Sequence, residues 1–279
     1  MLLRRGDFGK DVKSLQRGLN RLGSILLVDS DFGPATRDAV ADSRVVLRRP
    51  GPPEADDALQ QAIAEVPDPF PPLTAAGVTF IARAEVSGPR NYRLKFKNPV
   101  WPSPKSGITI GIGYDLSSVS REQLQADWAD HLQPDAIIRL GRVLGKRGSA
   151  DRLGRVRDIE VPLPDAVTVF LQRSLPDYGE RARSIYPQVD DLTPARRTAL
   201  LSIVYNRGTR LRDSDPVRKE RLEMRTIRKL LAAGRFDEIA DQIDAMSRLW
   251  DPGKQPGLVQ RRHDEARLWR SGFVALQLA

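Results

Sequence analysis

The chain has 279 residues and a formal net charge of +9, from 45 lysines and arginines against 36 aspartates and glutamates. This charge favours an anionic partner, and the balance of 40% hydrophobic and 29% charged residues excludes a chain that is disordered throughout. Cysteine is absent, and His131 and His263 are the only histidines. Disulfides and thiolate metal sites are therefore excluded, and we expect neither a metal nor a cofactor.

Membrane and secretion signals are not evident in the sequence. No run of about 20 apolar residues is present, and the first ten residues, MLLRRGDFGK, lack the apolar stretch of a signal peptide. We expect a chain that is made in the cytoplasm and does not insert stably into a membrane. If it acts outside the cytoplasm, it needs another route of release or injection.

The first 66 residues are electrically neutral, with ten basic and ten acidic residues. Apolar residues at helical spacing predict helices over 9–23, 34–46 and 56–66, with a turn at 29–32. Gly23 is a favourable residue just beyond a helix end, and Pro34 suits the first position of a helix. Residues 1–66 are thus predicted to form a small three-helix domain.

Four prolines between residues 67 and 72 forbid a helix and predict an extended linker over 67–73. A helix follows at 74–86 with Thr74 as its N-cap. The next stretch is rich in proline, glycine and aromatic residues and predicts a loop and a small sheet that ends in a strand at 108–114.

The remainder of the chain is predicted to be helical. The predicted helices cover 121–132, 134–145, 162–186, 193–208, 223–234, 235–250 and 257–272. One helix, a small sheet and many further helices indicate an α+β protein that is mostly α-helical, with a second domain at 74–279.

Residues 3–48 carry RRGDFGKDVKSLQRGLNRLG and then VDSDFGPATRDAV. These motifs resemble the peptidoglycan-binding type 1 family, although Ser30 stands where that family usually has glycine. The resemblance implies a three-helix domain that binds cell wall, with Asp29, Asp31 and Phe32 on the turn as candidate groove residues. The alternative is a three-helix spacer in which Phe32 belongs to the core.

The second domain carries TIGIGYDL at 109–116 after a helix that ends in Ala84-Glu85, followed by VYNRGT, EMRTIRKL, SRLW and GLVQRRHDEARLW. In this order the segments resemble the phage-type lysozyme superfamily, and within it the pesticin-like muramidases. The resemblance covers about residues 74–270. It implies a lysozyme-like fold and cleavage of the β-1,4 bond between N-acetylmuramic acid and N-acetylglucosamine, as in a modular endolysin.

Glycoside hydrolysis needs an acid for the leaving oxygen and a carboxylate or an oriented water at the anomeric carbon. Glu85 is the candidate acid, because apolar residues on the same face of its helix would turn it toward the hairpin and bury it partly. The alternative is an exposed glutamate that pairs with Arg83 or Arg90.

The second carboxylate departs from common phage lysozymes, because no acidic residue lies between Val86 and Ile108. The pesticin-like pattern places an aspartate six residues after the strand threonine, which is Asp115 relative to Thr109. We interpret Asp115 as the base and Thr109 as the hydroxyl that positions the water. Such a water-mediated route indicates inversion. The alternative for Asp115 is a turn residue that caps the next element.

Three further residues are candidates for substrate contact. Tyr114 is expected to line the cleft. Asn206 is expected to bind a sugar N-acetyl or hydroxyl group, and Arg207 to meet either the lactyl carboxylate of a muramyl sugar or the carboxylate of Glu85. The alternative for the last two is a helix C-terminus that Gly208 closes.

The leading hypothesis is a monomeric peptidoglycan hydrolase that acts in the periplasm and does not bind nucleic acid. The alternatives are a catalytically inactive cell-wall binding protein, an injected antibacterial muramidase and a basic nucleic-acid binder. The last of these lacks a recognisable motif.

Overall fold

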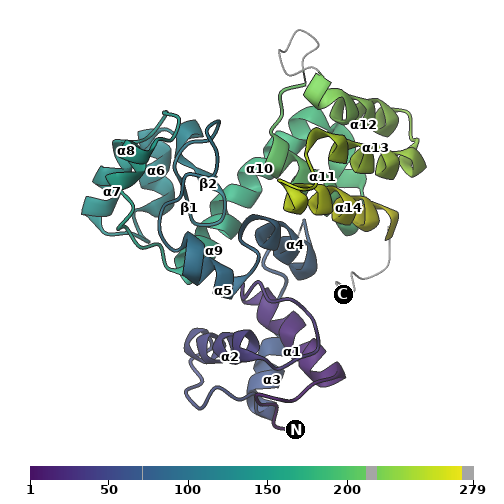
Figure 1. Ribbon diagram of the computed structural model, residues 1–279. Coiled ribbons are helices and arrows are strands. Elements are labelled where there is room, and N and C mark those ends of the chain that lie inside the picture. Colours follow the sequence, from purple (N-terminus) through teal and green to yellow (C-terminus); the bar gives the residue numbers. More distant parts are fainter. Residues whose placement is uncertain (71, 212–218, 272–279) are drawn as a thin grey trace. The chain divides into compact units, whose positions relative to one another are not determined.

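The computed structural model describes residues 1–70, 72–211 and 219–271. In this part of the chain helices dominate, and two short strands form a small antiparallel sheet, which confirms the predicted fold class (Figure 1). The chain divides into two compact units, Met1–Pro69 with Ala82–Leu175 and Phe70–Ile81 with Pro176–Ala279. The predicted segments 1–66, 67–73 and 74–279 stay a prediction, and the compact units group residues 82–175 with the N-terminal segment and residues 70–81 with the C-terminal one.

The N-terminal part of the first unit contains the three predicted helices, α1 (Lys10–Arg21), α2 (Pro34–Val46) and α3 (Asp57–Ala64). They enclose a core of their own, in which Leu19, Val40 and Leu59 are completely buried. Local signals set the helix ends. Gly23 has a φ of +82° just beyond α1, and the Asp56 carboxylate accepts a hydrogen bond of 2.8 Å from the Leu59 amide.

Helix α4 (Ala75–Val86) starts in the second unit, where the Thr74 hydroxyl accepts a hydrogen bond from the Gly77 amide, as a predicted N-cap should. The rest of the first unit begins at Ala82 in this helix. A π-helical segment at Tyr92–Phe96 and a 3-10 turn at Leu116–Ser118 also belong to this unit. Its further elements are α5 (Pro89–Asn91), β1 (Thr109–Ile110), β2 (Tyr114–Asp115), α6 (Arg121–Trp128), α7 (Pro134–Gly141), α8 (Ala150–Gly154) and α9 (Leu163–Val169).

The predicted strand at 108–114 is wrong in extent. The chain reverses within it, and strands β1 and β2 form a tight hairpin in which Thr109 pairs with Asp115 and Ile110 with Tyr114. Gly111 and Gly113 have φ values of +57° and +72°, which glycine adopts without steric cost. Gly111 and Gly113 therefore lie in the turn of the hairpin and not within a longer strand.

The regular elements in the described part of the second unit are all helices, joined by turns and loops. Its elements are α10 (Leu175–Ile185), which begins at the unit boundary, α11 (Pro194–Arg207), α12 (Leu222–Ala232), α13 (Ile239–Ala245) and α14 (Pro256–Ser271). Helix α14 packs against α11 and α13, and α12 packs against α13 (Figure 1). Within the described part of the chain, none of the helices combines the length and the apolar character that crossing a membrane would require.

The motif GLVQRRHDEARLW has a structural role in the second unit. The Glu265 carboxylate is completely buried and accepts hydrogen bonds from Ser202 Oγ at 2.5 Å and from Arg262 at 2.7 Å. Arg261 donates to the Ser202 carbonyl at 3.0 Å. These bonds fasten α14 to α11, since a buried charge needs charged and hydrogen-bonding partners.

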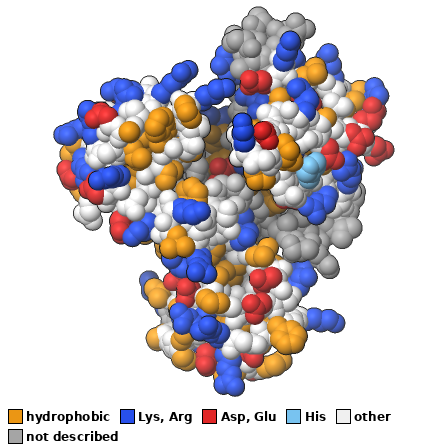
Figure 2. All heavy atoms as spheres, in the orientation of Figure 1, with side chains coloured by type: hydrophobic (Ala, Val, Ile, Leu, Met, Phe, Trp, Pro, Cys, Tyr) orange, Lys and Arg blue, Asp and Glu red, His pale blue; other side chains and the backbone are white. Residues whose placement is uncertain are grey.

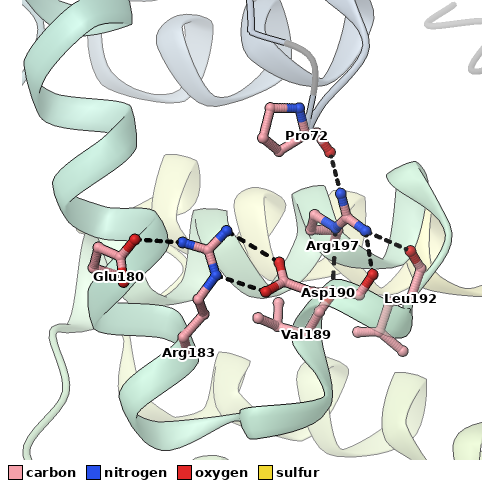
Figure 3. A network of polar contacts seen from close by, with 7 residues as sticks. All are labelled: Pro72, Glu180, Arg183, Val189, Asp190, Leu192 and Arg197. Carbon is pink, nitrogen blue, oxygen red and sulfur yellow. Dashed lines mark hydrogen bonds and ion pairs between the residues drawn. The ribbon is translucent and has the colours of Figure 1, made fainter.

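Two arginines organise the segment between α10 and α11 (Figure 3). Arg183 pairs with both Glu180 and Asp190 at 2.6 Å. Arg197 donates to four backbone carbonyls, those of Pro72, Val189, Asp190 and Leu192. Arg197 thereby ties the end of the proline-rich segment to the second unit.

Candidate functional site

The β1–β2 hairpin brings two of the predicted catalytic residues together. Thr109 and Asp115 lie directly opposite each other on the two strands, six residues apart in sequence. Thr109 also pairs through its backbone with Val100, with N–O distances of 2.8 and 2.9 Å, and its residue is only 9% exposed. The Thr109 backbone is therefore held by hydrogen bonds to Val100, and toward β2 the neighbouring Ile108 carbonyl accepts from the Leu116 amide.

The Asp115 carboxylate is fixed by backbone donors. Oδ1 accepts a hydrogen bond of 2.8 Å from the Ser117 amide, and Oδ2 accepts one of 3.2 Å from the Gly107 amide. A Cβ atom at position 107 would lie 2.3 Å from Oδ1 of Asp115, so only glycine fits beside this carboxylate. Asp115 is thus the N-cap of the 3-10 turn, as the alternative interpretation of this residue stated.

Glu85 lies in the last turn of α4, in the same compact unit as the hairpin, and is half-buried. The helix ends directly after it at Val86, and the next two residues, Ser87 and Gly88, have φ values of +61° and +131°. A non-glycine residue in the left-handed region costs about 1 kcal/mol or more. Glu85 therefore precedes a sharp and strained chain reversal.

Tyr114 has an internal partner. Its hydroxyl donates a hydrogen bond of 2.8 Å to Asp127, and its ring meets Trp128 edge-on with 5.5 Å between ring centroids. Gln123 also donates to the Asp127 carboxylate. Only 9% of Tyr114 is exposed, so its main contribution in this structure is to pack the hairpin against α6.

Asn206 and Arg207 lie in the second unit, at the end of α11. Gly208 follows at a φ of +70° and closes the helix, as the structural alternative for this motif stated. Arg207 lies over the Trp250 ring at 5.0 Å and donates to the Glu220 carbonyl at 2.6 Å. Burial, with the positive charges of neighbouring arginines, lowers the pKa of Arg207 to about 10.

The turn at 29–32 is organised by Gln16, which sequence reasoning missed. Its Nε2 donates to Asp29 Oδ1 at 2.7 Å and to the Asp31 carbonyl at 2.9 Å, and its Oε1 accepts from the Ser30 amide at 3.0 Å. Gln16 is buried although glutamine is usually exposed, and only the fold shows why it is present.

The three residues predicted on this turn differ in exposure. Asp29 and Asp31 are exposed, whereas Phe32 is completely buried in the core of the three-helix segment. The Phe32 side chain therefore does not line a groove. Ser30 has a φ of +70°, which explains why glycine would be favourable at this position.

Comparison with known proteins supports the predicted resemblance only for the N-terminal segment. Residues 8–42 match the family model described as "Putative peptidoglycan binding domain". No curated protein matches the chain. The matched residues include α1, the turn and the first part of α2, so the chain carries a peptidoglycan-binding segment, and this indicates association with the cell wall.

Proposed function

We propose that this chain is a peptidoglycan hydrolase of the muramidase type, arranged as a modular endolysin. The N-terminal three-helix segment would hold the wall, and the unit that contains the hairpin would cleave the β-1,4 bond after N-acetylmuramic acid. The observation that carries the proposal is the pairing of Thr109 with Asp115 across the hairpin, within the compact unit that also contains Glu85.

In the proposed reaction Glu85 gives its proton to the leaving glycosidic oxygen. A water held by the Thr109 hydroxyl attacks the anomeric carbon and passes its proton to Asp115. One backbone amide on each Asp115 oxygen holds the carboxylate in place and leaves acceptor capacity on each oxygen for this water. Tyr114 lies in the same unit and stays a predicted substrate contact, whereas Asn206 and Arg207 belong to the second unit and stay predictions from the sequence alone.

Surface charge supports a wall substrate. Basic side chains gather over α7 and α8 of the first unit, where the exposed members are Arg142, Lys146, Arg147, Arg155 and Arg157 (Figure 2). Positive charge on this surface attracts an anionic polymer at long range and raises its association rate.

The test is the release of reducing ends from purified peptidoglycan by the wild type and by Glu85→Gln. We expect the variant to lose activity at least about a hundredfold, because general acid catalysis contributes about that much. Glu65→Gln, an exposed glutamate at the end of α3, is the matched control and should be fully active. Equal activity of Glu85→Gln and the wild type would contradict the proposed acid.

A second candidate function is a wall-binding protein without catalysis. It is favoured by one observation, the use of both Asp115 oxygens as acceptors for backbone amides. In that case the wild type would pellet with peptidoglycan and release no reducing ends.

A further inference from the structure

A cavity of about 470 Å³ lies in the first compact unit, and none of Glu85, Thr109 and Asp115 lines it, although Glu85 lies in sequence between the lining residues Arg83 and Ser87. One wall comes from residues 26–36, which lie inside the peptidoglycan-binding match. The other wall comes from residues 83–94, which lie outside it. The cavity is therefore composite, and the matched segment alone supplies only half of its lining.

The side of the cavity that residues 26–36 form is acidic. Asp29 and Asp31 are exposed and line the cavity, and the buried Thr36 lies beside them. Gln16 and the Asp31 amide both donate to Asp29 Oδ1, so the Asp29 carboxylate and the Asp31 backbone are held together on the turn. A pair of carboxylates two residues apart attracts a cationic group such as an alkylammonium.

The wall outside the match is basic. Arg83 is half-buried and donates to the Ile25 carbonyl at 3.2 Å, which ties this wall to the N-terminal segment. Burial lowers the pKa of Arg83, and the charge of Asp29 partly offsets that effect, so the acidic and basic walls interact electrostatically. Arg90 on α5 is exposed and lines the same cavity, where its guanidinium can bind a carboxylate.

Two exposed leucines complete the cavity. Leu27 is 40% exposed on the first wall and Leu94 is 71% exposed on the second. These exposed apolar side chains lie in the same cavity as the acidic and basic residues. Such a lining suits a ligand that carries a positive and a negative group joined by a short alkyl chain.

We propose that this composite cavity binds a peptidoglycan peptide that ends in a zwitterionic diamino acid. The ammonium group would lie at Asp29 and Asp31, the terminal carboxylate at Arg90, and the alkyl chain along Leu27 and Leu94. The inference rests on the wall-binding part of the proposed function and is independent of the hydrolytic step.

The test is calorimetric titration of the full chain with a synthetic tripeptide, N-acetyl-L-alanyl-γ-D-glutamyl-diaminopimelate, whose only ammonium is on the last residue. Two further probes are the same peptide with that amine acetylated and the same peptide with its terminal carboxylates amidated. We expect Asp31→Asn and Arg90→Gln each to weaken binding of the parent peptide roughly tenfold, as loss of a charged hydrogen bond does. Lys95→Gln, which removes an exposed charge from the same segment outside the cavity, should bind like the wild type.

The probes identify which charge each residue recognises. Amidation of the carboxylates should weaken binding of the peptide to the wild type and have little further effect on its binding to Arg90→Gln. Acetylation of the amine should weaken binding to the wild type and have little further effect on binding to Asp31→Asn. No binding by the wild type, or unchanged binding by both variants, would overturn the proposal. Glu85→Gln should bind the peptide normally, so lost hydrolysis with intact binding leaves the cavity assignment standing.

Discussion

Two turns in this protein present aspartates, and they use them differently. At the 29–32 turn Gln16 accounts for part of the hydrogen bonding, and Asp29 and Asp31 stay exposed beside a cavity. At the hairpin, backbone amides take both oxygens of Asp115. Asp29 and Asp115 both serve as internal hydrogen-bond acceptors, and they differ in that Asp29 is exposed whereas Asp115 is half-buried.

The largest effect is expected at the hairpin. Asp115→Asn should reduce the release of reducing ends at least about a hundredfold if the carboxylate also acts as the base. Its stability should fall by about 1–3 kcal/mol, because asparagine can keep the cap on the Ser117 amide but its NH2 group cannot accept the hydrogen bond from the Gly107 amide. Thermal unfolding and the reducing-end assay on the same sample distinguish the loss of stability from the loss of activity. A stability loss with full activity would mean that Asp115 is a cap and nothing more.

Gln16→Ala should destabilise the protein by about 1–3 kcal/mol, because it removes a buried amide that holds three partners on the turn. Pelleting on peptidoglycan should weaken as the turn loosens, while Asp29 and Asp31 are still present. Gln61→Ala, on the exposed side of α3, is the matched control and should change neither quantity. Unchanged wall binding in Gln16→Ala would show that the order of the turn is not needed.

Sequence patterns predicted the starts of several helices, because those starts depend on neighbouring residues. They missed α5 and α8, and they predicted one helix at 162–186 where the structure has α9, a π-helical segment and α10. Pro34 begins α2, and Asp56 and Thr74 cap the helices that follow them. The extent of the sheet was wrong, because two glycines in an apolar run are compatible with either a strand or a turn. The composite cavity could not be predicted from the sequence, because Asp29 and Arg90 are distant along the chain and only the fold brings the two sides of the cavity together.

The smallest effect concerns backbone strain. Ser30→Gly should stabilise the protein by up to about 1 kcal/mol, because glycine adopts the positive φ of this position without steric cost. The same substitution at Ser14, an exposed position inside α1, should destabilise by about 0.5 kcal/mol. Chemical denaturation of both variants measures the two signs, and a loss of stability at both sites would contradict the assignment of strain at Ser30.

The most direct test of the central claim is the identity of the sugar at each new reducing end. Purified peptidoglycan is digested with the wild type, reduced with borohydride and hydrolysed, and the sugar alcohols are identified. The account predicts that the alcohol of muramic acid accumulates with time and that Glu85→Gln does not produce it. Accumulation of the glucosamine alcohol instead, or of neither, would contradict the assignment of a muramidase.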